Sequence, residues 1–172
     1  MFFQINDEDG FLALLNSQQY CSFVDEDWSD EQLMQHFITQ MQQKNLLLWQ
    51  TCDNVDGGFW NIEVIVGIEH PQYGQQFSHD IRVSQGRLDL CCYSDLTMAA
   101  QFETIHLPVA QHEQYVIPLE NGLYTVTVCK CFEDGEYSFE PMDTDPHFKI
   151  YIAPQLLDGL SWINKIPWSR YY

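Results

Sequence analysis

Basic residues are scarce in this chain. Seven Lys and Arg stand against 25 Asp and Glu among 172 residues, so the formal net charge is −18. Such a surface repels nucleic-acid phosphates and anionic membranes, which argues against direct binding of either, and it attracts basic proteins. Solubility of a small domain needs a net charge of only about 2–8, so the excess requires a further explanation.

Long apolar runs are also missing. No stretch approaches the ~20 apolar residues of a membrane-spanning helix, and residues 1–7 lack the basic and apolar regions of a secretory signal. We therefore expect a cytoplasmic protein whose cysteines stay reduced. No Pro-, Gly- or Ser-rich linker, repeat or low-complexity segment divides the chain, so we expect a single domain.

Sequence motifs of common catalytic sites are absent. There is no His-Glu-x-x-His helix, no Gly-x-Ser-x-Gly elbow and no phosphate-binding glycine loop. The histidines are scattered, at His36, His70, His79, His106, His112 and His147. We expect a protein that is not an enzyme and needs no cofactor.

The cysteines are predicted to be small core residues. They are Cys21, Cys52, Cys91, Cys92, Cys129 and Cys131. Residues i and i+2 of a strand share a face, so Cys129 and Cys131 could both bind zinc, but the pattern fixes no further ligand. Buried thiols are the favoured interpretation of this pair and of the adjacent Cys91 and Cys92.

Calcium is a second metal to consider. The segment from Glu133 to Asp145 places six carboxylates in thirteen residues, and Ca²⁺ prefers such oxygen ligands. The helix-loop-helix calcium spacing is missing, however, and a charged hairpin tip explains the same segment without an ion.

The composition otherwise predicts a folded, mainly β protein. Hydrophobic residues make up 45% of the chain and aromatic residues 15%, more than a disordered acidic segment contains. Two short helices are expected in residues 1–44. The first begins after Asn6, with an apolar face of Phe11, Leu12, Leu14 and Leu15. The second begins at a capping box, Ser29 to Gln32, and runs to about Gln43.

The spacing of apolar residues changes to two beyond residue 45 and predicts about eight strands. They are Leu46–Thr51, Phe59–Val66, Asp80–Ser84, Arg87–Tyr93, Gln101–Leu107, Tyr115–Leu119, Leu123–Cys131 and His147–Ile152. No helix-length crossover separates them, so we predict an antiparallel β-sandwich over residues 45–153 rather than parallel units. The aromatic tail, 154–172, should cover a sheet face or edge, with a homodimer contact as the alternative.

The acidic residues fall into clusters that are candidates for partner binding. The first contains Asp25, Glu26 and Asp27, followed by Asp30 and Glu31; the second contains Glu133, Asp134, Glu136, Glu140, Asp143 and Asp145. Trp28 and Tyr137 are the aromatic anchors expected beside them, because buried Trp and Tyr often dominate interface energies. For Trp28 the alternative is a contact with the core at the helix entry, and for acids near helix starts it is the helix dipole.

Three segments carry a pattern that resembles a known family. Trp28, Asp30, Glu31, Gln35 and Phe37 form a Trp-x-Asp-Glu start that leads to a Gln-x-Phe pair; Gly58–Val64 is a glycine-led strand; Ile117–Val126 is a proline-to-Gly-x-Tyr hairpin. Together they resemble the competence protein J family, inhibitors of a DNA-entry nuclease, over residues 27–130. His36 departs from this pattern, where a small residue is expected.

The resemblance implies that the chain inhibits a nuclease by binding it, as an immunity protein does against a toxin. The charge leads separately to the same class of partner, because a nuclease cleft is lined with Lys and Arg that hold phosphates. We therefore expect an inhibitory protein that presents an acidic surface to the active cleft of a basic nuclease or toxin. A metal- or ligand-binding β-sandwich without catalysis is the alternative.

Overall fold

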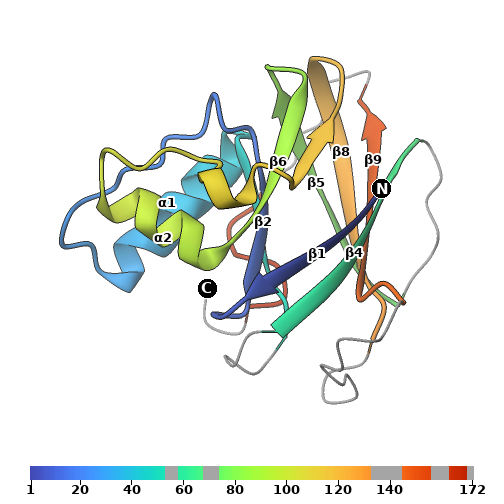
Figure 1. Cartoon of the computed structure of the whole chain (residues 1–172), viewed down its shortest axis with the longest axis horizontal. Coiled ribbons are helices and arrows are strands. Elements are labelled where there is room, and N and C mark those ends of the chain that lie inside the picture. Colours follow the sequence, from blue (N-terminus) through green and yellow to red (C-terminus); the bar gives the residue numbers. More distant parts are fainter. Residues whose placement is uncertain (53–57, 68–73, 133–144, 156–162, 170–172) are drawn as a thin grey trace.

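The computed structural model describes residues 1–52, 58–67, 74–132, 145–155 and 163–169. Within them the chain forms two β-sheets with two α-helices gathered at one end (Figure 1). The five-stranded sheet has the order β1-β4-β9-β8-β5, with β1 at Phe2–Asp7, β4 at Gly58–Val66, β9 at Phe148–Pro154, β8 at Gly122–Lys130 and β5 at Gln75–Val83. The four-stranded sheet has the order β3-β2-β6-β7, with β3 at Leu46–Gln50, β2 at Phe11–Leu15, β6 at Arg87–Cys92 and β7 at Val116–Pro118. The mainly β prediction is confirmed in this form.

Helix α1, Asp30–Gln42, matches the predicted second helix. The Ser29 hydroxyl accepts a hydrogen bond from the backbone N–H of Gln32, whose side chain in turn accepts from the Ser29 N–H, so the capping box is complete. Its buried face, which includes Leu33, Phe37 and Met41, packs on the core. No helix in the described part of the chain is long and apolar enough to cross a membrane.

The predicted first helix is wrong. Residues 2–7 and 11–15 instead form strands β1 and β2, which belong to different sheets and are joined by residues 8–10, with Gly10 at a positive φ of 77°. All five residues of β2 are buried, because this strand lies between β3 and β6 and has side chains packed on both faces. Burial on both faces removes the spacing of two that identifies a half-buried strand.

The predicted strand Gln101–Leu107 is also wrong, and a helix was missed just before it. Helix α2 spans Tyr93–Gln101 and buries Leu96, Ala99 and Ala100, which recur at helical spacing. Figure 1 shows α2 beside α1 at the end of the four-stranded sheet. Its first residue directly follows β6, so the run of apolar residues from β6 concealed the start of the helix.

The prediction of antiparallel pairing alone is wrong at one place. Strands β4 and β9 pair in parallel, with Ile62 opposite Phe148 and Val66 opposite Ile152. Parallel strands need a long connection, and here the whole chain from β5 to β8 lies between the two in sequence. The expectation that no helix-length segment separates the strands also fails between β6 and β7, where α2 lies, although these two strands pair antiparallel.

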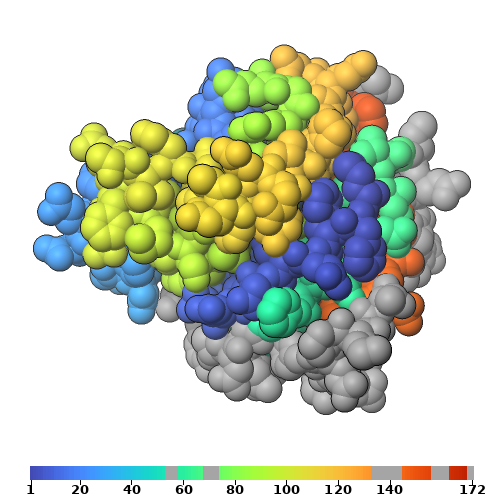
Figure 2. Space-filling view, in the orientation of Figure 1, coloured from blue at the N-terminus to red at the C-terminus, as the bar shows by residue number. Residues whose placement is uncertain are grey.

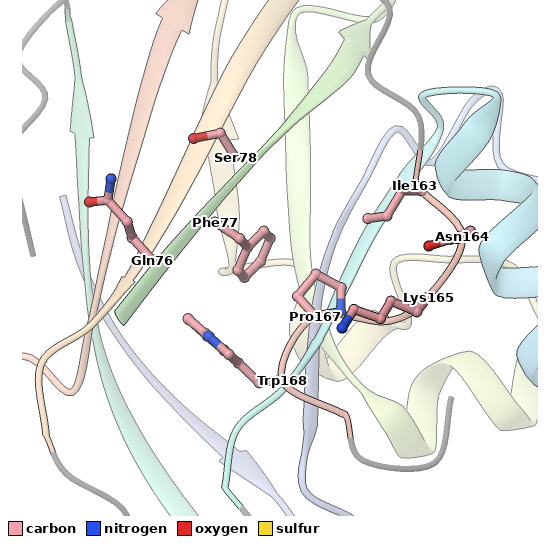
Figure 3. Close-up of a pocket in the computed structure, with 8 residues that line it drawn as sticks. All are labelled: Gln76, Phe77, Ser78, Ile163, Asn164, Lys165, Pro167 and Trp168. Carbon is pink, nitrogen blue, oxygen red and sulfur yellow. The ribbon is translucent and has the colours of Figure 1, made fainter. Parts of the chain in front are cut away.

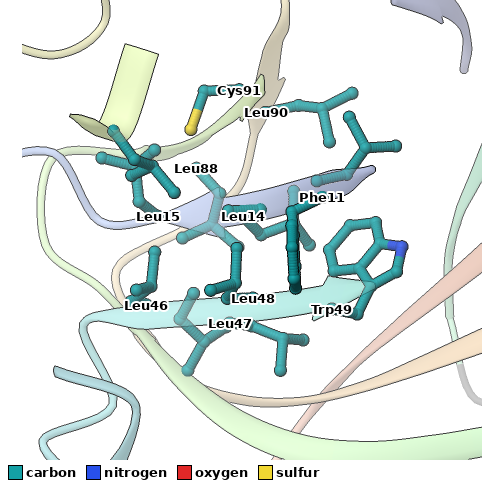
Figure 4. Close-up of a cluster of buried hydrophobic side chains, with 14 of the residues drawn as sticks. Phe11, Leu14, Leu15, Leu46, Leu47, Leu48, Trp49, Leu88, Leu90 and Cys91 are labelled. Atoms are coloured by element: carbon teal, nitrogen blue, oxygen red, sulfur yellow. The ribbon is translucent and has the colours of Figure 1, made fainter. Parts of the chain in front are cut away.

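Side chains from both sheets meet in one core. Figure 4 shows its leucine-rich part, built by β2, β3 and β6. Across the sheets, the Trp49 ring of β3 meets the Phe148 ring of β9 edge-on, with 6.2 Å between ring centroids. The Trp60 ring also contacts Phe148, at 5.4 Å. These rings join the two layers into one hydrophobic unit.

The described part of the C-terminal tail, 163–169, packs on both sheets. The Pro167 carbonyl accepts a hydrogen bond from the Gln50 N–H at 3.1 Å, at the outer strand β3 of its sheet. Ile166 is fully buried, and the Trp168 ring meets the Phe77 ring of β5 edge-on at 4.9 Å. The segment therefore occupies an edge that would otherwise expose unpaired backbone groups.

Candidate protein-binding surface

The acidic segment before α1 is fixed to the end of α2. The backbone N–H groups of Val24 and Asp25 both donate to the Ala100 carbonyl, at 2.8 and 3.3 Å. The Gln101 side-chain amide donates to the Glu26 carbonyl at 3.1 Å. These bonds hold the backbone of the acidic segment while its side chains remain exposed.

The five carboxylates of this segment point to solvent for two different reasons. Asp30 and Glu31 occupy the first turn of α1, where negative charge is favoured by the helix dipole by about 0.3–1 kcal/mol each. Asp25, Glu26 and Asp27 precede the helix and gain little from it. The Asp27 N–H donates to the Asp25 carboxylate at 3.2 Å, so a local turn presents these three side chains together.

Exposed apolar side chains lie among the carboxylates. Phe23 is 37% exposed beside Val24, and Met98 and Phe102 are 47% and 45% exposed one helical turn apart at the end of α2. Figure 2 shows the segments that carry them together at one end of the molecule, in blue and yellow-green. We call this area the α1–α2 surface; its members are Phe23, Asp25, Glu26, Asp27, Asp30, Glu31, Met98, Phe102 and Glu103.

The α1–α2 surface is built from segments that contain no basic residue. No Lys or Arg occurs between residues 1 and 43 or between residues 88 and 129. The ion pairs formed by Lys or Arg between described residues lie on or next to the sheets: Lys44–Asp80 at 3.6 Å, Arg87–Asp89 at 3.4 Å and Lys149–Glu63 at 3.5 Å. Among the described residues, Lys and Arg therefore lie outside the segments that build the α1–α2 surface.

His36 adds no positive charge to this end near neutral pH. Burial lowers the pKa of its imidazole, although the hydrogen bond to the Cys21 carbonyl at 2.7 Å acts in the opposite direction. Its ring also lies edge-on to Tyr20, with 5.9 Å between centroids. The carboxylates of the α1–α2 surface therefore have no positively charged side chain on α1 beside them.

The remaining predicted site residues lie elsewhere or outside the described residues. Trp28 is half-buried and packs against the core, as expected for a helix-entry contact. The Asp145 carbonyl accepts a hydrogen bond from the Asn61 side chain at 3.3 Å, so it lies beside β4, apart from α1 and α2 (Figure 1). Outside the described residues are Glu133, Asp134, Glu136, Tyr137, Glu140 and Asp143, and with them the predicted calcium loop.

The predicted zinc pair, Cys129 on β8 and Cys131 just after its end, does not gather further ligands among the residues described. Cys129 is buried and its thiol donates to the Gln76 side-chain oxygen, with 3.7 Å between sulfur and oxygen. The exposed Cys131 thiol donates to the Cys129 carbonyl. Among the described residues, one group of three potential metal ligands has its ligand atoms within 4.8 Å of one another, and it consists of Cys92, Asp95 and His112.

That cluster was missed from the sequence, although part of its signal was visible. Cys92 precedes the first turn of α2 and Asp95 lies in that turn, so a Cys-x-x-Asp spacing places both side chains together. The His112 Nδ1 lies 2.5 Å from an Asp95 carboxylate oxygen. Burial raises the pKa of the Cys92 thiol to about 11, so it is not an activated nucleophile at neutral pH.

A separate pocket of about 390 Å³ lies between β5 and the C-terminal segment. Figure 3 shows the rings of Phe77 and Trp168, which meet edge-on, in its lining, with Lys165 and Pro167 beside them. The Lys165 ammonium group beside the rings of Phe77 and Trp168 suits a small aromatic anion as a ligand. The pocket shares no residue with the α1–α2 surface.

No protein-family model and no curated protein matches the chain. Among solved structures, Crocagin biosynthetic gene J superposes with a TM-score of 0.57 and 15% sequence identity, over 90% of this chain and 96% of that chain. ComJ from Bacillus subtilis, inhibitor of the DNA degrading activity of NucA, superposes over the same shares with a TM-score of 0.44 and 8% identity. The first likeness establishes a shared fold, whereas the second is too loose to compare sites.

Proposed function

We propose that this protein binds a basic protein, a nuclease or toxin, and inhibits it by placing the α1–α2 surface against the nucleic-acid cleft. The observation that supports this most is a surface with six exposed carboxylates and three exposed apolar side chains, on segments without Lys or Arg. The resemblance of residues 27–130 to the competence protein J family leads to the same class of function.

The physical basis is complementary charge and shape. A cleft that holds phosphates carries Lys and Arg, and carboxylates fixed on a folded surface attract it over about a Debye length, ~8 Å at physiological salt. Rim charges mainly raise the association rate, whereas buried apolar contacts slow dissociation. In this proposal Asp25, Glu26 and Asp27 steer the encounter, and Phe23, Met98 and Phe102 supply the contacts that last.

No side chain of this protein has to react in such a mechanism. Inhibition requires only that the bound protein keeps nucleic acid out of the cleft, so the proposal includes neither catalysis nor a cofactor. A cytoplasmic location and dimerisation through the C-terminal tail stay predictions from the sequence.

The first experiment uses the purified chain as bait in a lysate of the producing organism at low salt. Bound proteins are eluted with rising salt, and each fraction is assayed for nuclease activity with and without added bait. We expect a fraction whose nuclease activity appears after elution and is lost when the bait is returned. Capture without inhibition of any activity in the fraction would contradict the proposal.

Two variants with the same net charge make the test specific to the site. The first replaces Asp25, Glu26 and Asp27 by Asn, Gln and Asn; the control replaces the exposed Glu8, Glu113 and Glu120 by Gln. The first variant should weaken inhibition and reduce its dependence on salt, while the control stays close to wild type. Equal weakening by both variants would mean that total charge acts, and not the α1–α2 surface.

A further inference from the structure

We infer that Cys92, Asp95 and His112 form a binding site for a transition-metal cation, and that Zn²⁺ is the ion the site suits. The sulfur, carboxylate oxygen and imidazole nitrogen of these residues lie within 4.8 Å of one another. The three ligands come from the end of β6, the first turn of α2 and the short 3₁₀ helix Ala110–His112. The site is distinct from the α1–α2 surface.

The ligand chemistry selects the class of ion. A thiol and an imidazole are poor ligands for Ca²⁺ and Mg²⁺, which prefer oxygen, whereas Zn²⁺ accepts sulfur, nitrogen and oxygen together. Three protein ligands leave one position of a tetrahedral ion for water, as in sites that keep an open coordination position. Binding releases the thiol proton of Cys92 to the solvent, and the resulting thiolate bonds the ion.

The geometry requires only a small closure of the side chains. With Zn–S near 2.3 Å and Zn–N or Zn–O near 2.0–2.2 Å, ligand atoms of a tetrahedral ion lie roughly 3.3–3.6 Å apart. The present upper limit of 4.8 Å exceeds this by about 1.2–1.5 Å. Side-chain rotation closes such a gap on an unchanged backbone. An ion placed between Asp95 and His112 replaces the hydrogen bond that now joins them.

The surroundings favour a cation and allow it to enter. Cys92 is 5% exposed and Asp95 8%, while the His112 side chain is 26% exposed and opens the cluster to solvent. Two further carboxylates lie near: Asp9 accepts a hydrogen bond from Ser94 at 2.8 Å, and Asp7 is close enough to act electrostatically on Cys92. Among described residues, Asp95 has His112 as its ion-pair partner and no Lys or Arg.

The test follows Co²⁺ as a spectroscopic substitute for Zn²⁺. Reduced, metal-free protein in which the two exposed thiols are removed by Cys21→Ser and Cys131→Ser serves as the reference chain. Titration with Co²⁺ should saturate at one ion per chain, with a thiolate-to-cobalt absorption band that Zn²⁺ then abolishes. No band in the reduced reference chain would overturn the inference.

Three further variants locate the ligands. Cys92→Ser should abolish the band, and His112→Ala should weaken Co²⁺ binding at least tenfold, since even indirect partners of metal ligands are worth about 10–100-fold. Cys129→Ser, which removes a buried thiol outside the cluster, should leave both unchanged. Circular dichroism establishes that each variant is folded. A band that survives Cys92→Ser, or unchanged affinity in folded His112→Ala, would refute the site. None of these readouts depends on nuclease inhibition.

Discussion

Protonation of Asp7 should stabilise this fold, and replacing Asp7 by Asn should remove that effect. Asp7 lies at the end of β1 and is 1% exposed. Desolvation by burial raises the pKa of its carboxyl from 3.8 to about 6, although hydrogen bonds from the backbone of Asp9 and Phe11 and from the Thr51 hydroxyl lower it in part. The folded protein therefore holds this proton at a pH where the unfolded chain has released it.

The sign and size follow from proton linkage. Between pH 3.8 and about 6 the folded state binds more protons at Asp7, so stability falls as the pH rises through this window and is constant outside it. The full difference between the two pKa values corresponds to about 3 kcal/mol. Between pH 4.5 and pH 7.5, about 2 kcal/mol of it is expected to appear.

The assay is urea unfolding of wild type and Asp7→Asn at these two pH values, with a chelator present. Comparison of the two proteins is needed because other groups titrate: burial raises the pKa of Asp89 but lowers the pKa of His79. The loss of one hydrogen-bond acceptor in Asp7→Asn changes its stability by the same amount at both pH values. Glu8→Gln is the control for the removal of one surface charge. On acidification, wild type should gain about 2 kcal/mol relative to Asp7→Asn. A gain below about 0.5 kcal/mol would show that Asp7 is already ionised without penalty in the fold.

Three smaller predictions concern the helix cap, the core and the C-terminal segment, each measured as the free energy of unfolding in urea. Ser29→Ala removes the hydroxyl that caps Gln32 and should lower stability by about 1 kcal/mol. Leu14→Ala empties a site with no exposed surface and should lower it by about 2–5 kcal/mol, whereas Met98→Ala, at 47% exposure, should change it by less than about 0.5 kcal/mol. Trp168→Ala removes ring contacts with Phe77 and Phe148 of the five-stranded sheet and should lower it by more than about 1 kcal/mol; no change would mean that the segment adds nothing to the core.

Local sequence features predicted those elements whose signals are local. Helix α1 has its capping box and its apolar face within thirteen residues, so no distant contact is needed to identify it. Strand β2 is the opposite case, because Phe11, Leu12, Leu14 and Leu15 fit the spacing of a helix as well as a strand buried on both faces. Its neighbours β3 and β6 decide between the two, and they lie far away in the sequence.

Contacts between residues far apart in the sequence also limited the prediction of the candidate sites. The exposure of Asp25, Glu26 and Asp27 was predictable from their charge. The hydrogen bonds that join this segment to Ala100 and Gln101 were not, because they link residues 75 or more positions apart and depend on a helix that the sequence pattern concealed. In the metal cluster, the Cys92 and Asp95 spacing was readable on its own. His112 comes from the short 3₁₀ helix after α2, and no spacing rule connects it to them.

The buried and the exposed acidic residues differ in what they contribute to folding. Asp89 is 1% exposed, and its partner Arg87 is required because a buried carboxylate without a cation costs several kcal/mol. The exposed acids of the α1–α2 surface need no such partner, since water solvates them, and their mutual repulsion opposes folding. The fold would therefore be as stable, or more stable at low salt, if Asp25, Glu26 and Asp27 were neutral. A surface charge that does not contribute to stability is best explained by a partner outside the chain. The variant in which Asp25, Glu26 and Asp27 are neutral tests this explanation. It should unfold no more easily than wild type, and it should lose inhibition.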